Sequence, residues 1–107
     1  MAVTFGVGNR GASHLSTNAY ARDISGTARD FEISGDDKSV NRLSLDRKAE
    51  LVYNMSNFNA IADCFILCRF LNRDLLTWGD YSEMLHLLTG MSKQKEELEE
   101  IANNIVT

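Results

Sequence analysis

The sequence of 107 residues contains no proline, and cysteine, histidine and tryptophan are also scarce. Its longest apolar run, residues 64–68, ends at Arg69, whereas a membrane span needs roughly 18 uninterrupted apolar residues. The first residues lack a basic stretch followed by an apolar one, so a secretory signal is not expected. Eleven basic residues against 15 acidic ones give a net charge of −4, which is unfavourable for binding nucleic acid. These absences predict a cytoplasmic protein with neither a membrane nor a nucleic-acid partner.

Metal-ligand spacing is also missing from the sequence. Cys64 and Cys68 are its two cysteines, and neither a CxxC nor an HxxxH pair occurs, whereas zinc and iron–sulfur sites need about four protein ligands. A disulfide between the two is not expected in a cytosolic chain. The ordinary expectation for free cysteines is burial as small apolar side chains. A zinc or redox switch is the alternative, and it requires an activated thiol.

What is present divides the chain by composition. Hydrophobic residues make up 44% and charged residues 24%, which is typical of one ordered globular domain. Five of the seven glycines fall within the first 35 residues, and residues 1–43 are predicted to be loop with room for one short helical turn. A loop of this length indicates a functional segment, or one that packs on polypeptide outside the chain.

Residues 44–70 predict a long amphipathic helix. Ser44 is the expected N-cap, and Asp46 lies in the first turn, where a helix favours negative charge. The helix is expected to end between residues 67 and 70. Its apolar residues follow the spacing of 3, 4 and 7 that places side chains on one face, with Asn54 and Asn57 between them; they are Leu51, Val52, Met55, Phe58, Ala62, Phe65 and Ile66.

Two shorter helices are predicted after it. Asp80 as N-cap, with Glu83 three residues later, has the pattern of a capping box, and Gly90 is the expected left-handed cap. The last helix begins near Ser92 and turns the acidic residues 96–100 to solvent. Its apolar stripe is Leu98, Ile101, Ala102 and Ile105.

The predicted fold is therefore all-α: a small bundle of about three main helices. Short connections favour antiparallel neighbours. The expected domain organisation is a Gly/Ser/Asn-rich loop segment over residues 1–43, followed by a helical domain over residues 44–107.

Three features offer reactive groups. Asp63 stands among apolar neighbours near the end of the long helix, close to Cys68, although a lone carboxylate can also simply face solvent. Arg10 and His14 give the glycine-rich segment a cation and a proton carrier. His86 lies between two leucines, which favours a structural or partly exposed histidine. These residues alone do not name an activity.

Five segments in order resemble the tungsten-containing aldehyde:ferredoxin oxidoreductase family. Residues 8–15 are similar to its NRGG/A-x-HL segment, and residues 48–52 to the start of the helix that follows it. Residues 63–68 resemble its D-x-x-G-L-C motif, with Ile66 in place of the glycine. Residues 81–90 resemble Y-x-E-L-L-N-A-x-T-G, and residues 96–102 resemble the E-E-L-x-x-I-G helix.

The resemblance implies an activity and cofactors for the parent enzyme. Family members oxidise aldehydes to carboxylic acids with a tungsten or molybdenum bis-pterin, and pass electrons to ferredoxin through a [4Fe–4S] cluster. Matched by motif, Cys68 would ligate the cluster, and Asp63, Arg10 and Leu67 would contact the cofactor. His14 would approach the metal pocket as the candidate catalytic residue.

The resemblance also implies that the chain is a fragment of the helical C-terminal region. The family's C-x-x-C-x-x-x-C cluster motif is not in the sequence, nor is the β-rich domain that cradles the pterins. The missing N-terminal part of the enzyme is thus an expected partner, and the isolated chain is expected to hold no cofactor and to be inactive. The alternative is a small helical interaction module without catalysis, which could form a homodimer through its apolar face.

Overall fold

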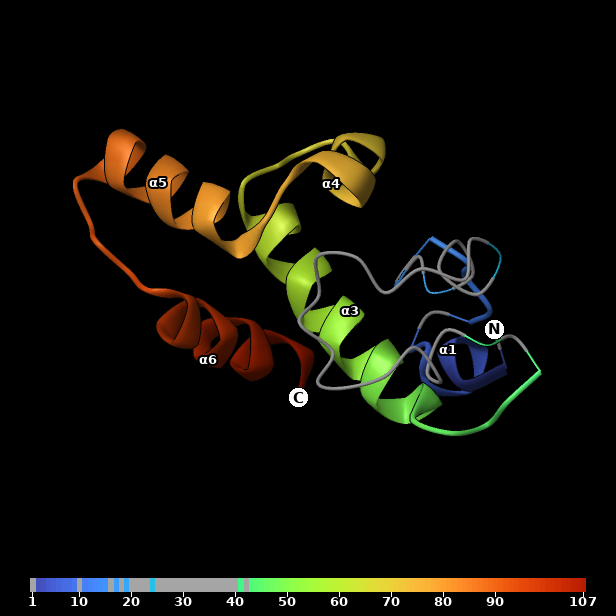
Figure 1. Cartoon of the computed structure of the whole chain (residues 1–107). Coiled ribbons are helices and arrows are strands. Elements are labelled where there is room, and N and C mark those ends of the chain that lie inside the picture. Colours follow the sequence, from blue (N-terminus) through green and yellow to red (C-terminus); the bar gives the residue numbers. More distant parts are fainter. Residues whose placement is uncertain are drawn as a thin grey trace. The chain divides into compact units, whose positions relative to one another are not determined.

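The computed structural model describes residues 2–9, 11–15, 17, 19, 24, 41 and 43–107, without the side chains of residues 72–74. Over these residues it contains helices and no strand (Figure 1), so the all-α prediction is confirmed. The helices are α1 (Ala2–Val7), α3 (Lys48–Cys64), α4 (Arg69–Leu75), α5 (Trp78–Thr89) and α6 (Lys95–Val106). The three main predicted helices correspond to α3, α5 and α6. None of the described helices is long and apolar enough to cross a membrane.

The chain forms two compact units, Met1–Ser56 and Asn57–Thr107. The first unit contains α1 and the first half of α3, and the second contains the rest of α3 with α4, α5 and α6. Much of the loop predicted over residues 1–43 lies outside the described residues, so the division at residue 43 stays a prediction.

A short helix and a glycine turn open the first unit. In α1, the buried Thr4 hydroxyl lies 3.1 Å from the hydroxyl of Thr17, which is also buried. After α1, the Gly11 N–H donates to the Gly8 carbonyl at 3.3 Å. A Cβ atom on Gly8 would approach the Gly11 oxygen to 2.8 Å, and Gly11 has a φ of +92°. Glycine at both positions is what this turn requires.

The start of α3 differs from the prediction. Ser44 does not cap the helix, because its hydroxyl accepts the N–H of Asp46 in a local turn at 3.0 Å. Arg47 then takes a left-handed conformation with a φ of 54°, and the helix begins at Lys48. The Arg47 guanidinium donates two hydrogen bonds to the Glu50 carboxylate, at 2.7 and 2.6 Å. Asp46 therefore precedes the first turn instead of lying in it.

Residues 57–62, in the C-terminal half of α3, are all buried. The apolar residues Leu51, Met55 and Phe58 are at most 3% exposed, as the stripe predicts. Asn57 and Asn59 are also buried, however, so residues 57–62 have no solvent face. The interpretation of Asn57 as a polar-face residue was wrong, because six consecutive residues span more than one turn of an α-helix.

Aromatic side chains join α3 to α5 within the second unit. The Phe58 ring makes T-shaped contacts with Trp78 and Tyr81, with centroids 5.2 and 5.3 Å apart and interplanar angles of 80° and 70°. Phe65 lies against Tyr81 at 5.5 Å. Phe58 and Tyr81 are at most 1% exposed, so this aromatic cluster is the core that fixes the C-terminal half of α3 against α5.

The capping box of α5 is one turn earlier than predicted. Thr77 is the N-cap, and Asp80 occupies the third helical position. The Thr77 N–H and hydroxyl donate to Asp80 Oδ2 at 2.6 and 2.7 Å, and the Asp80 N–H donates to Thr77 Oγ1 at 3.3 Å. At the other end Gly90 has a φ of 76° and donates its N–H to the His86 carbonyl, so the predicted glycine cap is confirmed.

The last helix contacts α5 and buries part of its predicted stripe. Leu98 and Ala102 are at most 2% exposed, whereas Ile101 and Ile105 are 40% and 54% exposed. The connection from α5 is fixed by the Ser82 hydroxyl, which donates to the Lys93 carbonyl at 2.5 Å. This bond holds the connection before α6 against α5 within the second unit.

Candidate functional site

The candidate site is the turn at which α3 ends. The Ile66 N–H donates to the Asp63 carbonyl at 3.0 Å, and the Leu67 N–H donates to the Ala62 carbonyl at 3.1 Å. These two bonds, with a left-handed residue between them, form a Schellman cap. The helix therefore stops at Cys64 and not between residues 67 and 70. Asp63 remains in its last turn, while Cys68 lies beyond the reversal.

Ile66 is the left-handed residue of this cap, with a φ of 56°. That position usually belongs to glycine, because a Cβ atom crowds the backbone there, and a β-branched residue is a marked exception. It is also the position of the glycine in the D-x-x-G-L-C pattern, so the pattern has a conformational reason. The Ile66 side chain is 92% exposed, and its assignment to the apolar face of the helix was wrong.

Asp63 is tied across the turn to the first residue of α4. Arg69 Nη2 donates to Asp63 Oδ1 at 3.0 Å and to Oδ2 at 2.8 Å. The Asp63 side chain is 60% exposed, whereas that of Arg69 is 25% exposed. The carboxylate is therefore held from one side and remains accessible from the other.

Both cysteines are exposed free thiols. Their expected burial as apolar filler was wrong, because α3 ends at Cys64 and Cys68 lies at the N-terminal boundary of α4. The Cys68 carbonyl accepts the Leu71 N–H at 3.0 Å, which fixes the backbone beside the thiol. An exposed thiol on an ordered backbone is available to a metal ion held mainly by other ligands.

Leu67 places its backbone within the same cap. Its N–H is already used by the Ala62 carbonyl, and its side chain is half-buried. A cofactor contact through Leu67 would thus have to use the carbonyl oxygen or the side chain. That assignment remains a prediction.

The turn has groups that suit the cofactors expected from the resemblance. A carboxylate with exposed oxygens accepts ligand N–H groups, and a thiolate suits iron. Arg69 Nη1 is buried without a hydrogen-bond partner among the residues that the structure describes, which leaves a donor over at this turn. Across the described part of the chain, no three His, Cys, Asp or Glu side chains converge on a metal position. The turn therefore offers one exposed thiol and one accessible carboxylate.

The glycine-rich segment belongs to the first unit. His14 is exposed and follows the Gly8–Gly11 turn, and Arg10 lies outside the described residues. The roles of Arg10 and His14 stay predictions.

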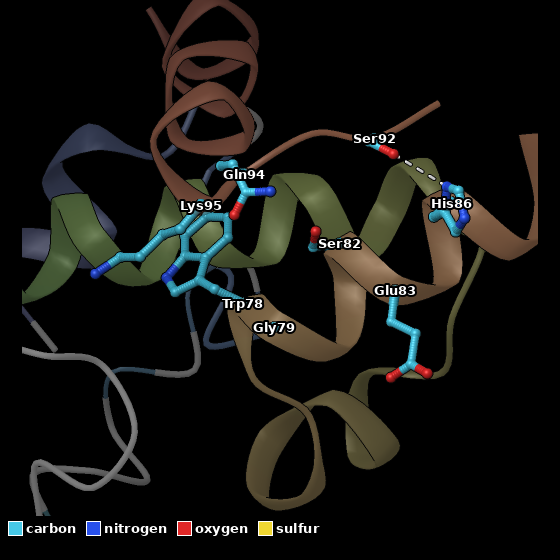
Figure 2. Close-up of a pocket in the computed structure, with 8 residues that line it drawn as sticks. All are labelled: Trp78, Gly79, Ser82, Glu83, His86, Ser92, Gln94 and Lys95. Atoms are coloured by element: carbon cyan, nitrogen blue, oxygen red, sulfur yellow. Dashed lines mark hydrogen bonds between the residues drawn. The ribbon is translucent and has the colours of Figure 1, made fainter. Parts of the chain in front are cut away.

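A concave feature separate from this turn lies between α5 and the start of α6. This hollow of about 310 Å³ is lined by residues that include Trp78, Glu83, His86, Ser92 and Lys95 (Figure 2). The Ser92 hydroxyl lies 3.1 Å from His86 Nδ1, and Figure 2 shows the Glu83 carboxylate extending away from that pair. A hydroxyl beside an imidazole without an orienting carboxylate is not the arrangement of an activated nucleophile. His86 is exposed, in line with the structural or partly exposed histidine expected.

Sequence reasoning missed Arg69. The residue follows the D-x-x-G-L-C pattern directly and lies outside it, so the resemblance drew no attention to it. The available signal was a cation six residues after an isolated acidic residue, with a predicted helix end between them. That signal depends on the residue at which α3 ends, and the end predicted from the sequence was several residues too late.

The comparison with protein families agrees with the resemblance. The family model described as aldehyde ferredoxin oxidoreductase, domains 2 and 3, matches residues 1–107. No curated protein and no solved structure matches the chain significantly.

Proposed function

Because the chain belongs to the aldehyde ferredoxin oxidoreductase family, we propose that it is a fragment of an enzyme that oxidises aldehydes to carboxylic acids and passes the electrons to ferredoxin. A tungsten or molybdenum bis-pterin and a [4Fe–4S] cluster would supply the redox chemistry in the assembled enzyme. The chain's own residues would bind and orient those groups.

The observation that supports this proposal most is the turn after α3. Asp63 and Cys68 lie on either side of the Schellman cap, and both are exposed. In the proposed role, Asp63 accepts hydrogen bonds from N–H groups of a pterin, and Cys68 contributes one thiolate to the cluster. Leu67 and Arg10 would add cofactor contacts, and His14 would approach the metal pocket.

The same geometry supports a division of the site between two polypeptide segments. One thiol cannot hold a [4Fe–4S] cluster, which needs four protein ligands. The other three ligands would come from the N-terminal part of the enzyme, which carries the family's C-x-x-C-x-x-x-C motif. We therefore expect the chain of 107 residues to be inactive by itself.

Metal analysis tests the proposal at two levels. The purified chain should contain neither iron nor tungsten in stoichiometric amount, and stoichiometric metal would overturn the fragment hypothesis. Co-expression with a polypeptide carrying the three-cysteine motif should yield a complex with a reducible cluster. The reduced cluster is detected by electron paramagnetic resonance.

Cysteine variants of that complex assign the ligand. Cys68→Ser should lose the cluster signal or change it, whereas Cys64→Ser, the matched control four residues away, should retain it. An unchanged cluster in Cys68→Ser would remove the residue from the proposed site.

The alternative, an interaction module without catalysis, is favoured by one observation. Several large apolar side chains on α4, on α5 and in the turn after α3 are exposed, and they would favour association where they form a contiguous patch; they include Ile66 at 92%, Leu87 at 74%, Phe70 and Leu88 at 73% and Leu75 at 69%. Sedimentation equilibrium separates the two hypotheses. A tight homodimer that excludes the three-cysteine polypeptide would support the module, and a stable mixed complex would support the enzyme.

A further inference from the structure

The bond between Arg69 and Asp63 uses one guanidinium nitrogen. Nη2 reaches both carboxylate oxygens, at 3.0 and 2.8 Å. In a bidentate arginine–carboxylate pair, two guanidinium nitrogens donate in parallel to the two carboxylate oxygens. Arg69 does not form such a pair, because only one of its nitrogens donates to Asp63.

The other terminal nitrogen of Arg69 does not contact Asp63. Nη1 is buried and has no hydrogen-bond partner in the described part of the chain. A buried unpartnered donor is unfavourable, and its retention needs an explanation elsewhere in the structure. The explanation we find is the contact that Nη2 makes with Asp63.

The protein anchors Arg69 more firmly than Asp63. The Arg69 side chain is 25% exposed and that of Asp63 60% exposed. One terminal nitrogen of Arg69, Nη1, is also buried. Arg69 is therefore the less exposed and the more restricted partner of the pair.

We propose that Arg69 is a positioning residue, which holds the Asp63 carboxylate in one orientation across the Schellman cap while leaving it open to a ligand. Each carboxylate oxygen has a second lone pair, so the pair with Arg69 does not prevent Asp63 from accepting ligand N–H groups. The identity of that ligand as a pterin rests on the proposed function. The contact between Arg69 and Asp63 is independent of the proposed function.

Nuclear magnetic resonance of the full 107-residue chain tests the coupling. Backbone-to-carboxyl three-bond couplings of Asp63 should report one χ1 rotamer in the wild type. Arg69→Gln should average them, whereas Arg69→Lys should preserve them, because one ammonium nitrogen can replace Nη2. Rescue by lysine is specific to a single-nitrogen contact, since lysine does not ordinarily replace arginine at a forked site.

Lys93→Gln is the matched control. It replaces a cationic side chain with a neutral one and so breaks the 2.6 Å pair between Lys93 and Glu97, and it should leave the Asp63 couplings unchanged. Couplings that are averaged in the wild type, or unaltered in Arg69→Gln, would overturn the inference.

The proposed function has a separate test in the assembled complex. If Asp63→Asn leaves the pterin content unchanged, the cofactor role of Asp63 is wrong while the Arg69 contact stands. If Asp63→Asn and Arg69→Gln both lower the pterin content and Arg69→Lys restores it, both proposals are supported.

Discussion

Ile66 donates its backbone N–H to the Asp63 carbonyl at 3.0 Å while its own φ is 56°, so the residue that closes α3 is an isoleucine in a left-handed conformation. For residues other than glycine this conformation costs roughly 1–2 kcal/mol. The side chain recovers little of that cost, because it is 92% exposed. The cap thus carries local strain beside the two residues proposed to contact cofactors.

Ile66→Gly should stabilise the chain. Relief of the left-handed strain, less the greater flexibility of glycine in the unfolded chain, leaves a net gain of about 0.5–1 kcal/mol. Urea unfolding followed by circular dichroism measures the change. Ile66→Ala keeps a Cβ atom and should show little gain, so equal effects of the two substitutions would contradict the strain argument.

The exposure of both cysteines has a direct chemical consequence. Cys64 and Cys68 are free and exposed, so both thiols should react with a disulfide reagent such as Ellman's reagent without denaturant. The colour should correspond to two thiols per chain, and each single serine variant should reduce it by half. Reaction of one thiol before unfolding and of the second only after it would contradict the position of α4.

Phe58 should be among the most sensitive positions of the second unit. It is 1% exposed and its ring contacts both Trp78 and Tyr81. Phe58→Ala should cost about 3–5 kcal/mol, a large part of the roughly 5–15 kcal/mol that stabilises a typical domain. Trp78 fluorescence during urea unfolding provides the measurement.

Phe70→Ala is the control for that prediction. The same atoms are removed from a side chain that is 73% exposed, so the change should stay within about 0.5 kcal/mol. Similar losses for the two variants would show that the aromatic cluster does not dominate the core.

The sequence predicted the helices better than their ends. Periodic apolar residues identified α3, α5 and α6, because burying one face is what stabilises a helix in a folded protein. The predicted helix starts were wrong where two nearby residues could both act as the N-cap. Ser44 had the chemistry of an N-cap but closed a local turn, and Asp80 proved to be the third helical residue under Thr77.

The candidate site could be predicted in part. The D-x-x-G-L-C pattern directed attention to Asp63 and Cys68, but their exposure depends on the end of α3 at Cys64. Isoleucine at position 66 concealed that end, since glycine is the usual signal for a left-handed cap. Arg69 could not be assigned, because its contact with Asp63 exists only after the chain reverses at Ile66.

The capping box of α5 should make stability depend on acid. The hydrogen bond from the Thr77 hydroxyl, and next that from the Thr77 backbone, lower the pKa of Asp80 from its ordinary value of 3.8. Because the folded pKa lies below the unfolded one, the stabilisation is fully present above about pH 4. It is lost as the pH falls through the lower folded value.

Urea midpoints measured between neutral pH and acid test this dependence. Asp80→Asn should unfold more easily than the wild type at neutral pH and show a smaller further loss in acid, because its amide does not titrate. Thr77→Ala should cost about 1 kcal/mol at neutral pH through loss of the cap and should also flatten the acid response. Glu97, whose pKa is lowered mainly by its hydrogen bond from Lys93, should supply the acid response that remains in both variants. A wild-type acid response retained in full by Asp80→Asn would show that the Thr77–Asp80 contact does not control it.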